Sequence, residues 1–453
     1  MNSFKRKTAL ILTLGLILTS IPFSKSHVNA AILPDPTEID AEQKEFVEGD
    51  VIVCMKTDDS AASYGNEVIT NDRAGAVAGL LDEAEDLMDV TEAVKEEVSV
   101  DETGDLSNDK AAADEEYTLK FIHSDHYTTK QLIEMLEEDP DILFAEPNYI
   151  YQLTEEIEED ILVDDEEIDM IPAETSELPE DRDGSEAELH DLSNLQYAYG
   201  NNEGGIDVPY WNNTDYRNAD DTVVAVLDTG VDYNHEDLKD VIWDDGLLYP
   251  ELTALGGGRY GYNGVDSTST GIPYYSYDPM DDQSHGTHCA GSVGAAWNGY
   301  GVSGTANGTR IMAVKAGNNK GSFPNKSTLK GFNYIKTAKE AGVNIVAVNN
   351  SWGGGVNSNS IALAVRELAE INVVCCFASG NDSADNDFIH FTSTVMREND
   401  GVICVNSNDP EVQKSSFSNY GVRSTDLSSP GTEILSTIPT DMGTTDPNLC
   451  LPV

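Results

Sequence analysis

Basic residues are scarce in this 453-residue chain, in which 26 Lys and Arg stand against 82 Asp and Glu, for a net charge of −56. Binding to nucleic acid or to an anionic membrane surface depends on clustered cations, so this balance argues against both kinds of partner. Most of the acids fall in the N-terminal half, where they predict a solvated, self-repelling surface that keeps the chain soluble.

Cysteine is also sparse. The six cysteines follow no regular spacing and mostly lie inside or beside apolar runs, at Cys54, Cys289, Cys375, Cys376, Cys404 and Cys450. This distribution is unlike the framework of a disulfide-rich secreted domain. We therefore expect mostly buried thiols rather than bridges.

Long apolar runs are absent except near the N-terminus. There, Lys5-Arg6-Lys7 precedes an apolar stretch from Thr8 to Phe23, and small residues lead to Ala30, which together predict a signal peptide over residues 1–30. The uninterrupted apolar part is too short to cross a bilayer comfortably. We expect a secreted protein without a membrane anchor, extracellular or associated with the cell surface.

Two segments separated by a long loop carry the residues with the clearest catalytic potential. The apolar run 223–227 ends at Asp228, which predicts a strand buried on both faces with its carboxylate at the C-terminal edge of a sheet. Further on, His285 opens a run of small residues that can pack closely as a helix. An acid that orients a histidine, and a histidine that accepts a proton, are two parts of an activated-nucleophile site.

The N-terminal half predicts a small α+β domain over residues 45–153. Strands are expected at 49–55 and 117–122, helices at 74–88 and 128–138, and a closing strand within 139–149. Thr128 and Gln131 have the spacing of a capping box. Residues 154–190 are dense in Asp and Glu, and they predict an extended, protease-accessible linker in which maturation cuts fall.

From residue 191 onward, apolar strands alternate with amphipathic helices. Strands are expected at 222–227, 311–315, 344–349, 373–378 and 402–405, and helices from 285, at 327–341 and at 359–371. This alternation predicts an α/β fold in which a parallel sheet carries helices on both faces.

The segments Asp228-Thr229-Gly230 and His285-Gly286-Thr287-His288-Cys289-Ala290-Gly291 resemble two motifs of the subtilisin-like serine peptidases. The closing segment, with Glu146-Pro147-Asn148-Tyr149, resembles the end of the propeptides that precede their catalytic domains. The resemblance implies a ferredoxin-like propeptide domain over residues 45–153 that occupies the substrate cleft as an intramolecular inhibitor. It also implies a subtilisin-like catalytic domain over residues 191–440, with protein or peptide substrates.

The same resemblance implies the roles of individual residues. Asp228 would hold Nδ1 of His285, which would act as general base. Asn381 would donate its side-chain amide to the developing oxyanion, and Gly380 would line the pocket for the residue before the cut. The segment Ser351-Trp352-Gly353 would pair with the substrate backbone as an added strand.

The third motif of the family, a serine in G-T-S-M-A, has no counterpart in this sequence. Residues 441–453 are unmatched, and Gly443-Thr444-Thr445 lacks the serine and the small residues after it, so Thr445 is not assigned as nucleophile. We expect a serine endopeptidase precursor whose sequence is incomplete, through truncation or a frameshift, and which is inactive as given. The alternative is a catalytically silent family member that acts as a peptide-binding or inhibitory protein.

Two metal hypotheses accompany this interpretation. His285, His288 and Cys289 share one face of the predicted helix and would suit zinc in a hydrolase, although the match to the peptidase motif favours the general-base role and no metal in the site. Asp237 stands where some relatives place a calcium ligand, but the loop from Trp297 to Gly301 is short for supplying the other oxygens. The predicted reaction itself requires no cofactor.

Overall fold

The computed structural model describes residues 46–57, 72–98, 115–153, 221–298, 301–354, 357–389, 401–432, 434–440 and 450–452. The predicted signal peptide, the acidic linker at 154–190 and most of the unmatched tail lie outside the described residues. Below, residues 46–153 are called the N-terminal region and residues 221–440 the C-terminal region.

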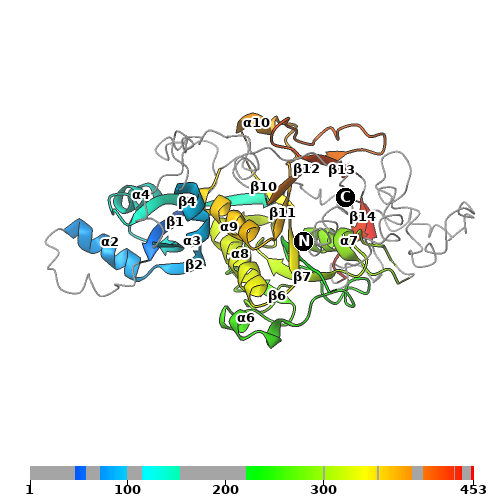
Figure 1. The fold of residues 1–453 in the computed structure, drawn as a ribbon, viewed down its shortest axis with the longest axis horizontal. Helices are drawn as coiled ribbons and strands as arrows, with labels where there is room; N and C mark the ends of the chain where they lie inside the picture. The colour runs from blue at the N-terminus through cyan, green and yellow to red at the C-terminus, as the bar shows by residue number, and fades with distance from the viewer. Residues whose placement is uncertain are drawn as a thin grey trace, which may run out of the picture.

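A seven-stranded sheet forms the centre of the C-terminal region (Figure 1). Its strand order is β13-β12-β11-β9-β5-β7-β6, and every neighbouring pair is parallel. The strands are β5 (Val223–Asp228), β6 (Gly261–Asn263), β7 (Arg310–Lys315), β9 (Ile345–Asn350), β11 (Val374–Ala378), β12 (Val402–Asn408) and β13 (Leu427–Pro430). The predicted parallel α/β sheet is confirmed.

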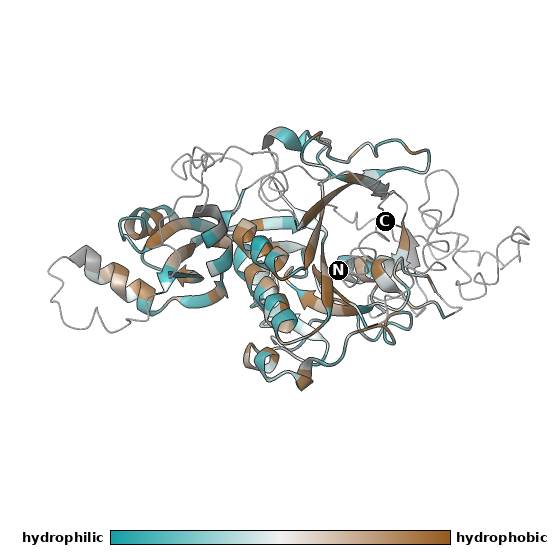
Figure 2. Ribbon diagram, in the orientation of Figure 1, coloured by the Kyte–Doolittle hydropathy of each residue, from teal (hydrophilic) through white to brown (hydrophobic). Residues whose placement is uncertain are grey.

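Helices cover both faces of this sheet. Val224 and Val226 of β5 pack in one apolar cluster with Ala290 and Val293 of α7 (His285–Gly294). The alternate residues of β5 pack in a second cluster with α8 (Asn325–Glu340) and α9 (Asn359–Glu370). Every residue of β5 is buried, as expected for a strand with helices on both sides. Figure 2 shows the apolar strands enclosed in this way.

Shorter elements complete the C-terminal region: η6 (Gly246–Leu248), α6 (Pro250–Ala254), β8 (Ser322–Pro324), β10 (Trp352–Gly353), α10 (Asn386–Ile389) and β14 (Leu435–Thr437), which pairs with β15 (Cys450–Pro452). The side chains of five of the six cysteines are described, and all five are free thiols, which confirms the expectation for those positions. Among the described helices, none combines the length and the apolar character that crossing a membrane requires.

The N-terminal region forms a separate antiparallel sheet with the strand order β4-β1-β3-β2. Its elements are β1 (Phe46–Thr57), α2 (Asp72–Asp82), β2 (Glu85–Asp89), α3 (Thr91–Val98), β3 (Glu116–His123), α4 (Thr129–Leu136) and β4 (Ile142–Leu153). The capping box is confirmed, because Thr128 and Gln131 exchange side-chain and backbone hydrogen bonds at the start of α4. The ferredoxin-like class of this region stays a prediction.

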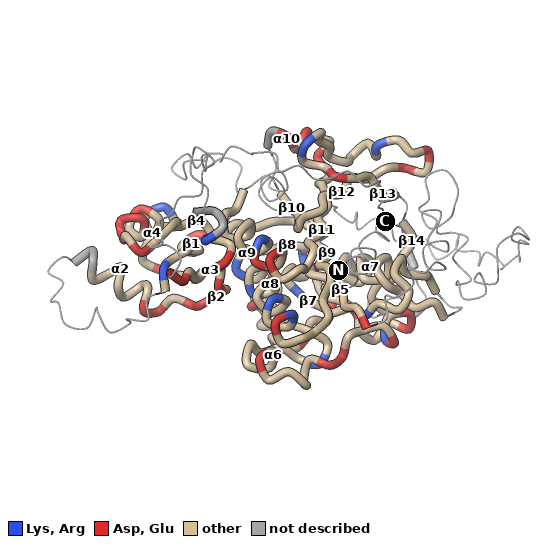
Figure 3. Tube along the Cα trace, viewed as in Figure 1, with Lys and Arg blue, Asp and Glu red and all other residues tan. Residues whose placement is uncertain are grey.

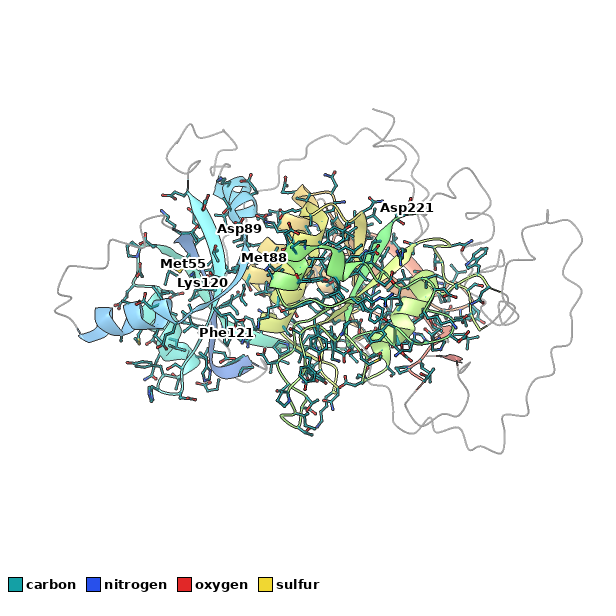
Figure 4. The ribbon with its side chains drawn as sticks, turned by 90° about the horizontal axis from the view of Figure 1, so that it is seen from below. Met55, Met88, Asp89, Lys120, Phe121 and Asp221 are labelled. Carbon is teal, nitrogen blue, oxygen red and sulfur yellow. The ribbon has the colours of Figure 1, made fainter. Side chains whose placement is uncertain are left out.

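The prediction of one helix over 74–88 is wrong at its C-terminal end. The helix α2 ends at Asp82, and the next residues form β2, in which Met88 pairs with Leu119 of β3. Leu87 and Met88 favour helix by propensity, but they are buried in the sheet core, and tertiary packing overrides a weak local preference. Figure 4 labels Met88 and Asp89 on β2, the strand of this sheet that faces the C-terminal region.

Charge complementarity joins the two regions. Glu85 of β2 pairs with Lys326 Nζ at 3.1 Å and Lys330 Nζ at 2.7 Å, both on α8. Lys326 also lies over the ring of Phe121, 4.0 Å from its centroid. Figure 3 shows the lysines of α8 beside the acids of the N-terminal region. Lysines of α8 thus pair with an acid of the N-terminal region where the two regions meet.

Candidate active site

Asp228 and His285 meet at the C-terminal edge of the parallel sheet. The strand β5 ends at Asp228 and the helix α7 begins at His285, and His285 Nδ1 lies 2.8 Å from Asp228 Oδ1. Asp228 is fully buried and His285 is 8% exposed. Because a carboxylate can only accept a hydrogen bond, Nδ1 of His285 carries the proton of this bond. Nε2 is then the ring nitrogen that can exchange a proton with a reacting group.

A glycine allows this close approach. A Cβ atom at Gly286 would lie 2.1 Å from the carbonyl oxygen of Gly230 and 3.1 Å from Cβ of Asp228. The start of α7 therefore contacts the turn after β5 with no room for a side chain. This packing explains in physical terms why the histidine of the motif is followed by glycine.

Opposing effects set the proton affinity of His285. Burial disfavours the imidazolium, but the neighbouring Asp228 carboxylate outweighs that penalty, and the pKa of His285 lies well above its ordinary value. Cys289 Sγ lies 3.7 Å from His285 Nδ1, and burial raises the pKa of the Cys289 thiol. A neutral thiol is a poor nucleophile, and His285 Nδ1, the nitrogen near this thiol, is bonded to Asp228, so this arrangement does not favour a cysteine mechanism.

A cavity of about 320 Å³ opens beside His285. It is lined by four predicted site residues, His285, Ser351, Gly380 and Asn381, with Cys289 beside them. The structure thus brings together residues from α7, the loop after β9 and the turn after β11. The roles predicted for Gly380 and Asn381 stay predictions.

The turn after β11 requires glycine at position 380. Gly380 has φ +101°, and a Cβ atom there would lie 2.5 Å from Nδ2 of Asn419. Asn419 in turn donates to the carbonyl of Ser379 and accepts from the amide of Asp382. The turn that carries Asn381 is therefore held from both sides by one buried side chain.

Trp352 and Gly353 do not line the cavity but form β10, a short strand directly after Ser351. The strand β4 of the N-terminal region runs antiparallel to β10, with Gln152 opposite Gly353. On its other side β4 pairs with β8, with Tyr151 opposite Phe323. An extended segment of the chain is therefore seated between two strands of the C-terminal region.

Sequence reasoning missed how Glu146 and Asn148 hold the two regions together. Glu146 Oε1 accepts from Ser358 Oγ at 2.7 Å, and Oε2 accepts from the backbone amide of Asn359 at 2.9 Å, at the start of α9. Asn148 Oδ1 accepts from the backbone amide of Lys326, at the start of α8. The acid inside the closing strand was the available signal, because a buried carboxylate needs donors.

The zinc ligands suggested by the sequence do not converge. His288 Nε2 lies 3.0 Å from the carbonyl oxygen of Ile434, which makes that nitrogen a donor rather than a metal ligand. Within the part of the chain that the structure describes, three potential ligand atoms gather only at Asp228, His285 and Cys289. The zinc hypothesis on His285, His288 and Cys289 is therefore wrong in its ligand set.

The surroundings of Asp237 do not fit calcium well. Its carboxylate accepts from the backbone amide of Val302 at 2.6 Å and lies 3.3 Å from Asn298 Nδ2, and burial raises its pKa to about 6. Calcium prefers several oxygen ligands, whereas the described partners of Asp237 are N–H groups. We derive no step through calcium.

The parallel sheet with helices on both faces, and the acid–histidine pair at its carboxyl edge beside a cavity, are the fold and the arrangement expected of a subtilisin-like serine peptidase. The model of the subtilase family matches residues 219–450, and the chain belongs to this family. It is 34% identical over 216 residues to the thermophilic serine proteinase of Bacillus sp. (strain AK1), across 48% of this chain and 45% of that protein. It is 32% identical over 220 residues to thermitase of Thermoactinomyces vulgaris, across 48% of this chain and 65% of that protein.

The fold comparison extends into the N-terminal region. Fervidolysin from Fervidobacterium pennivorans, a keratinolytic enzyme related to subtilisin, superposes with a TM-score of 0.56 over 88% of this chain and 49% of that chain. At 19% identity the likeness concerns the fold alone. The chain spans about half the length of these relatives.

Proposed function

We propose that this chain is the precursor of a secreted subtilisin-like serine endopeptidase that hydrolyses extracellular proteins through an acyl-enzyme. The observation that carries the proposal is the buried hydrogen bond of 2.8 Å between His285 Nδ1 and Asp228 Oδ1. Asp228 holds the imidazole in the tautomer that leaves Nε2 basic. His285 takes the proton of the attacking hydroxyl and then delivers it to the leaving amine.

The remaining site residues act on the substrate. The amide of Asn381 stabilises the oxyanion of the tetrahedral intermediate, and the pocket at Gly380 receives the side chain before the cut. The edge formed by Ser351, Trp352 and Gly353 binds the substrate backbone as an added strand. In support, Ser351, Gly380 and Asn381 line the same cavity as His285.

The nucleophile is not among the assigned residues. The 453 residues contain no serine in a G-T-S-M-A motif, so we propose that this 453-residue chain forms no acyl-enzyme. Loss of the nucleophile in a peptidase of this kind lowers the rate by about a millionfold.

We further propose that residues 45–153 are a propeptide that inhibits the site within the same chain, that 154–190 is the linker cut during maturation, and that 191–440 is the catalytic domain. The seating of β4 between β8 and β10 supports this, because it fills the edge where a substrate strand would pair. The acidic composition and the predicted signal peptide fit a secreted zymogen.

The test compares the 453-residue chain with a version in which the residues after Pro439 are replaced by the serine-bearing segment of thermitase. We expect hydrolysis of a peptide amide substrate by the extended chain only, after its N-terminal region has been removed by maturation. Asp228→Asn and His285→Ala in that extended chain should each abolish the hydrolysis. Hydrolysis that survives His285→Ala, or a folded extended chain with no hydrolysis, would overturn the proposed function.

A catalytically silent member that binds peptides without cutting them is the second candidate. It is favoured by the missing motif, together with an intact cavity and strand edge. The nucleotide sequence past codon 453 separates the two candidates. A G-T-S-M-A coding stretch in any frame supports the peptidase, and unrelated sequence after an undisturbed stop supports the silent protein.

A further inference from the structure

Asp281 is a buried carboxylate that the site described above does not use. It lies in the loop before α7 and is 1% exposed. Its Oδ1 accepts from Thr229 Oγ1 at 2.9 Å and from the amides of Gln283 and Ser284 at 3.0 and 3.1 Å. Its Oδ2 accepts from the amide of Thr287 at 2.9 Å and from Thr287 Oγ1 at 2.6 Å. So many donors on one buried side chain make it a rigid junction.

The junction links the two segments that carry the acid–histidine pair. Thr229 directly follows Asp228, and its Oγ1 both donates to Asp281 and accepts from the amide of Gly286 at 2.9 Å. Thr287 lies in the first turn of α7, two residues after His285. Asp281 therefore connects the end of β5 to the start of α7. It binds Thr229, which follows Asp228, and Thr287, which follows His285 by two residues.

Ser284 shows how firmly the start of α7 is held. Its φ is 107°, in a region that residues with a side chain rarely adopt. Its amide donates to Asp281 Oδ1 at 3.1 Å. Since Ser284 immediately precedes His285, this unfavourable backbone conformation sets the direction in which the imidazole leaves the chain, and Asp281 is the group that stabilises it.

We propose that Asp281 is a positioning residue for the acid–histidine pair, which fixes the distance and angle between His285 Nδ1 and Asp228 Oδ1 without touching the substrate. This inference rests on the proposed roles of Asp228 and His285. It assigns Asp281 a task beyond stabilising the loop, because its partner Thr229 directly follows Asp228 and its partner Thr287 lies two residues after His285.

Asp282 provides the matched control. It is the next residue in the chain and carries the same charge, but it pairs with Lys315 Nζ at 2.7 Å and with the hydroxyl of Tyr274. Among the described hydrogen bonds, Asp282 binds neither Thr229 Oγ1 nor Thr287, although its partner Lys315 also donates to the carbonyl of Thr229. Asp282→Asn therefore removes one negative charge from the same loop while leaving the junction in place.

The experiment records the low-field proton on His285 Nδ1 by NMR in the intact 453-residue chain, labelled with 15N-histidine. It compares the unchanged chain with Asp281→Asn, Asp282→Asn and Asp228→Asn. We expect Asp281→Asn to move this resonance upfield or to lose it through faster exchange with water, and Asp282→Asn to leave it in place. Thr229→Val removes the hydrogen bond from Thr229 Oγ1 to Asp281 and should move the resonance in the same direction, but by less. This variant replaces Asp281→Asn if Asp281→Asn does not fold.

Each outcome decides one statement. If Asp228→Asn abolishes the resonance while Asp281→Asn and Thr229→Val leave it unchanged, the pair is real and the positioning role of Asp281 is overturned. If Asp281→Asn and Asp282→Asn shift it equally, loss of charge explains the shift and the positioning role is again overturned. If Asp228→Asn changes nothing, the proposed acid–histidine pair itself fails.

Discussion

The ring of Tyr151 packs against the ring of Trp352, with centroids 5.6 Å apart, although the two residues belong to the two different regions of the chain. Trp352 in turn stacks on Phe323 of β8, with centroids 5.6 Å apart, and its Nε1 donates to the carbonyl of Leu227 at 3.0 Å. Leu227 precedes Asp228. The N-terminal region is therefore anchored by an aromatic side chain next to the strand that carries the acid.

Tyr151→Ala should weaken the docking of the N-terminal region. Tyr151 is 1% exposed, and truncation of a large buried aromatic costs about 3 kcal/mol or more. Urea unfolding of the full chain, followed by tryptophan fluorescence, measures the loss. Leu143→Ala in the same strand is the control, because Leu143 is 49% exposed and should cost far less. Equal effects of the two substitutions would contradict the anchoring role of Tyr151.

Glu146→Ala should loosen the start of α9. The carboxylate of Glu146 accepts from the amides of Asn359 and Ser360, so its loss leaves buried donors without partners, at a cost of about 1–2 kcal/mol. Hydrogen exchange of the full chain should show faster exchange at these two amides. Glu116→Ala, on the solvent-facing side of β3, is the control. Unchanged protection at Asn359 and Ser360 would show that another group satisfies the helix start.

Sequence patterns sufficed for the parts of the molecule that are set locally. A run of apolar residues ending in an acid predicted β5 and the place of Asp228, and the spacing of Thr128 and Gln131 predicted the start of α4. They failed at β2, where pairing with β3 decides the conformation of Met88. A local preference for helix carries no information about a partner strand.

The contacts that hold the site together could not be predicted from sequence. Asp281 bonds to Thr229 across 52 positions of the chain, and Glu146 bonds to Ser358 across 212. No periodicity connects such pairs, since each depends on how the sheet edge and the helix starts converge in the fold. His288 illustrates the same limit, because its spacing suits a metal but its ring nitrogen is bound to a backbone carbonyl.

Asp228→Asn should destabilise the chain in a pH-dependent manner. The pKa of His285 is raised in the folded state, so the stabilisation from the pair is fully present below the unfolded pKa of about 6.5 and is lost as the pH rises through the higher folded pKa. Melting temperatures of the unchanged chain and the variant should therefore differ more at about pH 6 than above that folded pKa.

Asp125→Asn is the matched control for this pH dependence. Asp125 also lies beside a histidine, with its Oδ1 3.3 Å from His123 Nε2, but its side chain is 88% exposed. An exposed pair contributes little, so the melting temperature should hardly change at either pH. A difference between Asp228→Asn and the unchanged chain that stays constant with pH would exclude the charged pair as its cause.

Gly380→Ala should disturb the turn that carries Asn381 more than a positive φ alone explains. Gly342 has a similar φ of +105°, yet nothing lies within 4 Å of a Cβ atom built there, so Gly342→Ala measures the backbone cost, about 1 kcal/mol. At Gly380 the added Cβ would also lie 2.5 Å from Asn419 Nδ2, and it would displace the side chain that binds Ser379 and Asp382.

We therefore expect Gly380→Ala to lower the free energy of unfolding by about 2–3 kcal/mol, because the displaced amide breaks buried hydrogen bonds. Equal losses in the two variants, measured by urea unfolding, would show that Asn419 moves away freely and that the turn depends on glycine for its backbone alone.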